Sequence, residues 1–120
     1  MARACEGYDD GLNKTERRFK TRLESLRVQQ RIKDFIMQAW TFKLAHDCRY
    51  TPDAVVVEND GTITLYDVKG FEREDAVLKM RVAAERFKWL RFRMIEEVRK
   101  HNSWRVTRRF NDDERMADIA

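Results

Sequence analysis

The chain has 120 residues, 42% of them hydrophobic, which suits one compact domain spanning residues 1–120. No apolar run approaches the roughly 20 residues that span a membrane, and the N-terminus lacks the apolar stretch of a signal peptide. Two cysteines and two histidines, none in a zinc-binding spacing, argue against a disulfide scaffold, zinc chemistry and a Ser-His-Asp triad. We therefore expect a soluble, cytoplasmic protein.

Charge is distributed unevenly along the sequence. Residues 1–12 and 110–120 together hold two bases and seven acids, and we expect both ends to be flexible acidic tails. Of the 25 bases and 21 acids in the chain, 23 and 14 remain in residues 13–109, a net charge of +9. Such a basic body suits a polyanion such as DNA, because each neutralised phosphate releases counterions. A surface that only confers solubility explains the charge equally well.

The first predicted element is a basic amphipathic helix from residue 13 to about residue 31. Phe19, Leu23 and Leu26 recur at helical spacing, and seven bases occupy the other faces. Asn13 suits the N-cap and Glu16 the N3 position, a variant of the capping box.

Strands are predicted next. Residues 34–45 mix aromatic, β-branched and polar residues and indicate one or two strands. Residues 54–57, an apolar β-branched run after Pro52, predict a buried strand. The sequence Asn59-Asp-Gly61 is a hairpin signal, and residues 62–69 alternate as the returning strand.

The remaining elements are a second helix and two more strands. Residues 75–88 repeat apolar positions at helical spacing, at Val77, Met80, Ala84 and Phe87. Residues 91–98 and 104–108 are strand candidates. The predicted order is helix, strands, helix, strands.

The most informative residues lie on the predicted hairpin. Residues i and i+2 of a strand share a face, so Asp67 and Lys69 continue the apolar row of Ile63 and Leu65. Burying a charge is costly unless it is paired or binds a metal. Asp53 begins the neighbouring strand, and hairpin pairing would bring its carboxylate near Asp67.

Two converging carboxylates beside a lysine can bind Mg²⁺ or Mn²⁺ and leave sites open for water and a phosphate. The metal would lower the pKa of bound water, and the lysine would orient the water and neutralise developing charge. This pattern predicts phosphodiester hydrolysis. The alternative is an ordinary cross-strand ion pair, which a lone D-x-K signals more often.

The motifs resemble a known family. Tyr50-Thr-Pro-Asp53, the run at residues 55–57, the turn, and Tyr66-Asp-Val-Lys-Gly70-Phe are similar to the PD-(D/E)xK nuclease motif. The similarity is to small phage endonucleases related to endonuclease I-type Holliday-junction resolvases, marked by YxPDF and EVKGF segments. It extends from Asn13 to about Val106. It implies an α/β, restriction-endonuclease-like core, a mixed, mainly antiparallel sheet flanked by two helices.

The resemblance also implies roles for particular residues. Asp53 and Asp67 would be metal ligands and Lys69 the catalytic lysine, with Mg²⁺ or Mn²⁺ as cofactor. The family's further acidic residue would fall on Glu16, for which helix capping is an equal alternative. Residues expected to contact the DNA backbone are Lys14, Arg17 and Arg18 on the first helix and Lys79 and Arg81 on the second, although a solvated helix face is an equal alternative for the last two.

Two positions depart from the family pattern. Asp67 stands where close relatives have Glu, and its shorter side chain would move the metal or recruit a bridging water. Ala54 stands where the family usually has Phe, which thins the core behind Asp53. Neither change removes a ligand, but both leave open an altered activity.

Three functions are thus weighed. The first is a phage-encoded, metal-dependent endonuclease for DNA, branched DNA included, which as a resolvase would act as a homodimer. Its subunit interface would draw on aromatic residues, although core packing is the commoner use of such residues. The second is a catalytically inactive, nuclease-like DNA-binding module, and the third an interaction factor acting through its acidic C-terminal tail. The aromatic candidates for the interface are Trp40, Phe42, Trp89 and Trp104.

Overall fold

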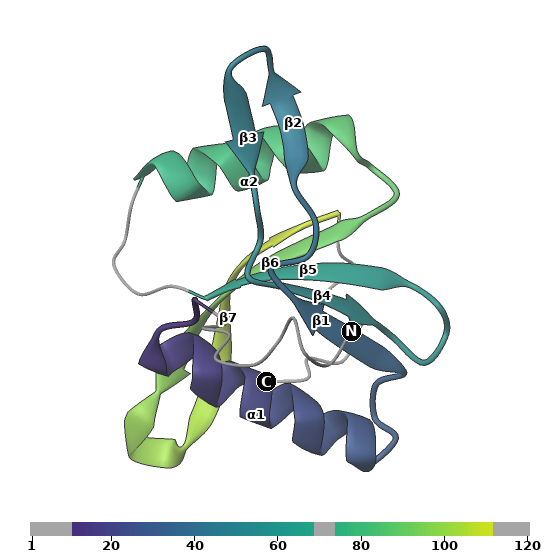
Figure 1. Cartoon of the computed structure of the whole chain (residues 1–120), viewed down its shortest axis with the longest axis vertical. Helices are drawn as coiled ribbons and strands as arrows, with labels where there is room; N and C mark the ends of the chain where they lie inside the picture. Colours follow the sequence, from purple (N-terminus) through teal and green to yellow (C-terminus); the bar gives the residue numbers. More distant parts are fainter. Residues whose placement is uncertain (1–10, 69–73, 112–120) are drawn as a thin grey trace, which may run out of the picture.

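The computed structural model describes residues 11–68 and 74–111. It contains two helices, a five-stranded sheet and a two-stranded sheet within those residues (Figure 1). In chain order the elements are α1 (Lys14–Val28), β1 (Asp34–Met37), β2 (Phe42–Ala45), β3 (Cys48–Tyr50), β4 (Ala54–Val57), β5 (Ile63–Val68), α2 (Glu74–Arg86), β6 (Arg91–Val98), a short 3₁₀ helix (Arg99–His101) and β7 (Ser103–Phe110).

The main sheet has the strand order β1-β4-β5-β6-β7. The pairings β1–β4, β4–β5 and β6–β7 are antiparallel, and β5–β6 is parallel, with α2 in the connection between them. A parallel pair needs such a crossover, whereas antiparallel neighbours can be joined by short turns. The expected mixed, mainly antiparallel sheet with two helices is confirmed.

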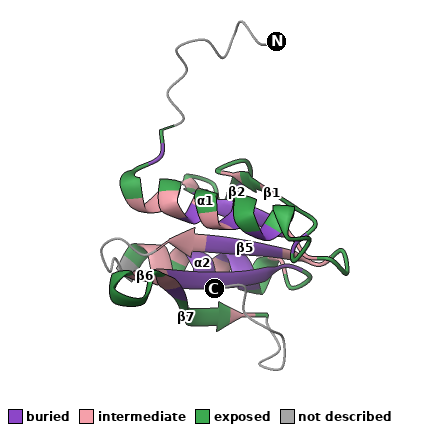
Figure 2. Cartoon of the chain, turned by 90° about the horizontal axis from the view of Figure 1, so that it is seen from below, coloured by how far each residue is buried: buried purple, intermediate pink, exposed green. Residues whose placement is uncertain are grey.

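The two helices cover opposite faces of the main sheet, α2 above it and α1 below it in Figure 1. Phe19, Leu23 and Leu26 of α1 pack on one face against Val56 and Tyr66, which confirms the predicted helical stripe. Figure 2 shows how burial differs between the strands: no residue of the central β5 is exposed, whereas half of the residues of the edge strand β7 are.

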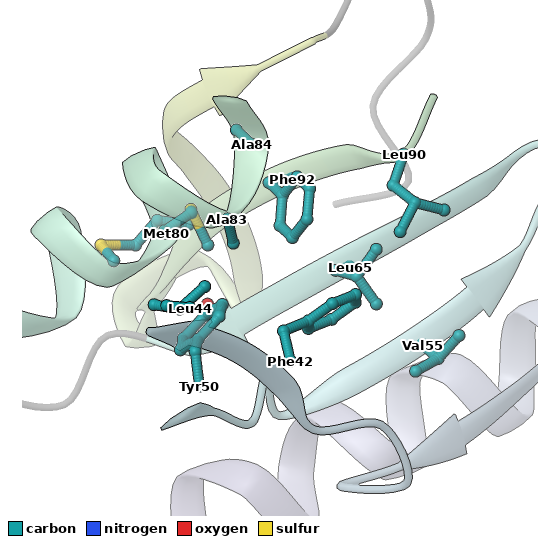
Figure 3. Packing of buried hydrophobic residues seen from close by; sticks show 11 residues of the cluster. Phe42, Leu44, Tyr50, Val55, Leu65, Met80, Ala83, Ala84, Leu90 and Phe92 are labelled. Carbon is teal, nitrogen blue, oxygen red and sulfur yellow. The ribbon is translucent and has the colours of Figure 1, made fainter. Parts of the chain in front are cut away.

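The other face of the sheet packs against α2 and against a hairpin made by β2 and β3. Leu44 and Tyr50 of the hairpin lie toward Met80 of α2, and Phe42 lies beside Leu65 and Phe92 of the sheet (Figure 3). Burying a large apolar side chain stabilises a fold by about 1.5–3 kcal/mol. The two clusters therefore hold the sheet from both sides.

The expected capping box of α1 is confirmed. The Asn13 side chain accepts a hydrogen bond from the Glu16 N–H, and the Glu16 side chain accepts one from the Asn13 N–H. The helix ends at Val28, about three residues before the predicted end, since Gln30 adopts a left-handed φ of 61°. No Gly, Pro or Asn marks this stop in the sequence.

The turn between β4 and β5 explains the hairpin signal. The Gly61 N–H donates to the Glu58 carbonyl and the Thr62 N–H donates to the Asp60 side chain, while Gly61 takes a φ of 89°. Glycine accepts a positive φ without steric cost. The turn thereby pairs Val57 with Ile63 and sets the register of both strands.

Four aromatic residues were expected as interface candidates, and they divide into two pairs. Phe42 and Trp104 are buried in the two cores, so the fold uses them for packing. Trp40 and Trp89 are 37% and 72% exposed.

In the part of the chain that the structure describes, no helix has the length and apolar character to cross a membrane.

Replacing Leu23 by Ala should lower the free energy of unfolding by about 2–5 kcal/mol, because Leu23 is fully buried beneath α1 and its removal leaves a cavity. Val28→Ala on the same helix is the matched control, since Val28 is 81% exposed and should change stability by less than about 0.5 kcal/mol. Urea unfolding measures both. Equal effects would show that α1 does not pack as described.

Candidate functional site

Asp53 lies directly before β4 and is anchored by its neighbours. The β4–β5 register pairs Ala54 with Tyr66, and its continuation brings Asp53 opposite Asp67. The Gln38 N–H donates to the Asp53 carbonyl at 2.8 Å, and the Val68 N–H donates to Asp53 Oδ2 at 2.7 Å. Asp53 is only 8% exposed, so its carboxyl group is fixed in a largely dry position.

Asp67 is the last residue but one of β5, and a tyrosine holds its carboxyl group. The hydroxyl of Tyr50, from β3, donates to Asp67 Oδ2 at 3.0 Å. Burial, and then the charge of Asp67, raise the pKa of Tyr50 above its ordinary value, so the hydroxyl remains a donor. The β2–β3 hairpin is therefore connected to the site by this bond as well as by the core.

Glu16 approaches the same place from the first turn of α1. Its carboxyl group accepts the Asn13 N–H at 3.0 Å and also interacts with the carboxyl group of Asp53. The capping role predicted for Glu16 is confirmed. Capping and proximity to Asp53 coexist, because a carboxylate has two oxygens and about four acceptor positions.

Three acidic side chains, Glu16, Asp53 and Asp67, thus form one group, called here the acid cluster. Burial raises the pKa of Asp53 to about 7, and a hydrogen bond to Asp67 and the charge of Asp67 act in the same direction. Burial also raises the pKa of Asp67 and the pKa of Glu16. Below about pH 7 Asp53 is therefore protonated and can donate a hydrogen bond to Asp67, because two close, buried carboxylates resist joint ionisation.

The acid cluster fits a hard divalent cation by its chemistry, since all its donors are carboxylate oxygens, the ligands that Mg²⁺ prefers. Within residues 11–68 and 74–111, however, no three His, Cys, Asp or Glu side chains are arranged to hold a metal as they stand. Below about pH 7 the proton on Asp53, and at any pH the Tyr50 hydroxyl on Asp67, compete with a cation for carboxylate oxygens. Metal binding would have to displace that proton.

Lys69, the expected catalytic lysine, lies outside the described residues, which end at Val68 on this side of the gap. Its role remains a prediction. Tyr50 was not among the predicted site residues, although it opens the Tyr50-Thr-Pro-Asp53 segment. The sequence signal for Tyr50 was a tyrosine three residues before the predicted site residue Asp53, because a buried Tyr hydroxyl usually has a hydrogen-bond partner.

The residues expected to contact DNA lie in different surroundings. Lys14 and Arg17 are exposed near Glu16 at the start of α1. Arg18 instead forms an ion pair with Glu97 of β6, with its Nε at 2.7 Å from Oε2. The two candidates on α2 also differ. Lys79 is half-buried, whereas Arg81 is exposed with its guanidinium group 5.9 Å from the ring centre of Phe110.

No protein-family model and no curated protein matches this sequence.

Without metal, we expect the free energy of unfolding to fall as the pH rises from about 4 to about 7, through Asp53. Its carboxyl group has an ordinary pKa of 3.8 and keeps its proton in the folded protein up to about 7. The folded state then binds more protons in this window, so rising pH destabilises it. The effect should be on the order of a few kcal/mol.

Asp53→Asn should remove this contribution. Urea unfolding in EDTA at about pH 4 and about pH 7 gives the free energy of unfolding of variant and wild type, and their difference at each pH is the contribution of Asp53. Taking the difference cancels the contributions of acids such as Asp34 and Asp60, whose pKa values are lowered. Excess Mg²⁺ should raise the melting temperature of wild type more above pH 7 than at pH 4, and should not do so for Asp53→Asn. A difference that is independent of pH would contradict the prediction.

Proposed function

We propose that this protein is a metal-dependent DNA endonuclease of the PD-(D/E)xK kind, which hydrolyses phosphodiester bonds with Mg²⁺ or Mn²⁺. The observation that carries the proposal is the meeting of Glu16 from α1, Asp53 from the position before β4 and Asp67 from β5. A fold that only needed stability would gain little from a buried carboxylate pair, because desolvation of charge is costly.

The residues of the site would have different chemical roles. Asp53 and Asp67 would hold the cation through carboxylate oxygens, and Glu16 would supply a further oxygen directly or through water. A cation bound there supplies Lewis acidity that activates water and stabilises charge on the phosphate. Tyr50 orients Asp67, and Val68 orients Asp53, through the hydrogen bonds described above. Lys69 would neutralise charge on the substrate.

The fold and the charge distribution support this proposal. The net charge of +9 in residues 13–109 favours a polyanionic substrate. The proposed contacts to the DNA backbone are Lys14 and Arg17, at the start of α1 beside Glu16, and Lys79 and Arg81 on α2. By the family resemblance the substrate is branched DNA and the active form a homodimer. By the same resemblance the enzyme is phage-encoded and acts in the cytoplasm of a bacterial host.

The direct test is nicking of a labelled four-way junction, a flap and a linear duplex with Mg²⁺, Mn²⁺ or EDTA. We expect metal-dependent nicking that falls by at least about 100-fold in Asp67→Ala and Lys69→Ala, because each removes charge stabilisation from the transition state. Glu24→Ala, an exposed acid on α1, is the control and should retain activity. Cleavage in EDTA, or full activity of both site variants, would refute the mechanism. Equal rates on all three substrates would remove the junction preference.

Glu16→Gln separates capping from catalysis. Glutamine at N3 completes a capping box as well as glutamate does, so the melting temperature should stay within the error of wild type. Loss of the negative charge should nevertheless reduce nicking by about tenfold or more, since the metal site loses a carboxylate. Parallel thermal unfolding and nicking assays measure the two effects. Unchanged nicking at unchanged stability would leave Glu16 with capping alone.

A catalytically inactive, nuclease-like DNA-binding module is the second candidate. The specific observation in its favour is that one carboxylate oxygen of Asp67 accepts a hydrogen bond from Tyr50. The Asp67 side chain is also shorter than the Glu that is usual in the family. This candidate gives salt-sensitive DNA binding and no cleavage with either metal. The nicking assay above therefore distinguishes the two candidates.

A further inference from the structure

The turn between β6 and β7 carries an exposed concentration of positive charge. Arg99, Lys100 and His101 form the short 3₁₀ helix, and Asn102 closes the turn with a left-handed φ of 48°. Residues 99–102, called here the basic turn, are all exposed, and none of them is acidic. Because Arg99 and Lys100 are adjacent cations on a protruding turn, the basic turn suits a polyanionic ligand.

An ion pair holds the end of this hairpin against α1. Glu97 of β6 accepts two hydrogen bonds from Arg18 of α1, from Nε at 2.7 Å and from Nη2 at 2.8 Å. The hydrogen bond from Arg18, and after it the charges of Arg18 and Arg99, hold the pKa of Glu97 below its ordinary value, so its carboxylate is ionised. A bidentate pair fixes direction as well as distance. The basic turn, two residues further on, is therefore held beside the first half of α1.

A surface hollow of about 270 Å³ lies between α1 and the same hairpin. Arg18 and Arg22 line it from α1, and Asn102 lines it from the basic turn. Glu97, the acid in this lining among the described residues, is bound by Arg18. Guanidinium and amide groups can donate hydrogen bonds to phosphate oxygens. The hollow therefore continues the cationic surface from the basic turn onto α1.

The basic turn lies at the same end of the sheet as the acid cluster. The parallel strands β5 and β6 pair Asp67 with Met94, so β6 runs on past Asp67 toward the turn. Five residues separate Met94 from Arg99, which at about 3.3 Å per residue limits the distance between their Cα atoms to about 17 Å. The end of β5, the start of α1 and the turn between β6 and β7 lie together at the left of Figure 1 and again at the left of Figure 2.

The chemistry of the basic turn fits the backbone of a DNA duplex better than a single strand. Surfaces that bind single strands typically add exposed aromatic rings, on which the bases stack. Residues 99–103 contain no aromatic side chain, and Trp104 is buried. In a duplex each strand advances by about 3.4 Å per nucleotide, so 17 Å corresponds to about five base pairs.

We propose that the basic turn binds the phosphate backbone of a DNA duplex within about five base pairs of the bond that is cut. Arg99 and Lys100 each contact a phosphate, and the Arg18–Glu97 pair positions the turn. The inference rests on the proposed nuclease function and adds that the substrate has a double-stranded flank beside the scissile bond.

The test measures binding apart from cleavage, by fluorescence anisotropy in EDTA with the full chain carrying Asp67→Asn. R99Q/K100Q should weaken binding of a blunt duplex by about tenfold or more. It should also reduce the slope of log K against log salt by about 1.8, about 0.9 for each lost phosphate contact. Binding of either separated strand should fall by less than about threefold, because the turn has no ring on which a base could stack.

Two further variants serve as controls. R31Q/K33Q removes two exposed cations at the opposite end of the sheet, where the Lys33 N–H donates to the Val57 carbonyl, and should leave duplex binding unchanged. R99K/K100R keeps both charges and should bind like the parent. The melting temperature of R99Q/K100Q should stay within the error of the parent, because both side chains are exposed. If it falls, R99K/K100R decides, and loss of binding in that variant overturns the inference.

Three results would overturn the inference directly. They are unchanged duplex binding in R99Q/K100Q, equal losses on duplex and single strand, and an equal loss in R31Q/K33Q, which would show a general effect of charge. In the nicking assay R99Q/K100Q should raise KM and leave kcat unchanged, because a contact away from the reacting atoms binds substrate and transition state equally.

The two proposals fail in different ways. Active nicking by wild type with unaffected binding in R99Q/K100Q overturns the role of the basic turn alone. A wild-type protein that binds duplex DNA through the basic turn, and nicks no substrate with either metal, overturns the nuclease function alone.

Discussion

The antiparallel register of β4 and β5 is the constraint on which the candidate site depends. The turn at Glu58–Gly61 fixes that register at one end, and at the other end it brings Asp53 opposite Asp67. A shift of one residue would turn every side chain of a strand to the other face. Val55 and Leu65 would then leave the core, so the hydrophobic packing of both strands enforces the meeting of the two acids.

The free-energy cost of burying two carboxyl groups is concentrated in a small region. Asp53 and Asp67 share a largely dry space, and among the described residues the Val68 N–H donates to Asp53 and the Tyr50 hydroxyl donates to Asp67. Strained or electrostatically unfavourable groups persist where the surrounding structure over-determines them. The two packed faces of the sheet provide that rigidity, and the acid cluster lies at the edge where the sheet, α1 and the hairpin meet.

Much of this arrangement could be predicted from the sequence, because short-range patterns govern it. The helical stripe of Phe19, Leu23 and Leu26, the capping box and the β4–β5 hairpin each follow from residues close in the chain. β3 was not predicted, since three residues are too few to show a period. The parallel β5–β6 pairing and the Tyr50–Asp67 bond join residues far apart, and no local pattern encodes them.

The site residues divide in the same way. Asp53 and Asp67 were predicted to meet through the hairpin, which is a local structure, and they do. The interaction of Glu16 with Asp53 depends on how α1 packs against the sheet, so only the family resemblance suggested it. Arg18, predicted as a DNA contact, forms an ion pair with Glu97 that no local pattern indicates, and its role toward DNA stays a prediction. Surface charge patterns do not reveal which cations the fold itself engages.

The connectivity of the main sheet also orders the assembly of the protein. The β4–β5 hairpin closes a short loop, whereas the parallel β5–β6 pair must wait for the α2 crossover, and loop closure over longer separations is slower. We expect the two aspartates to come together early in folding, while most of the sheet is still open. Glu16 joins them only when α1 docks. The charge repulsion of the site is thus met in stages, and the last acidic group arrives when the surrounding packing can already hold it.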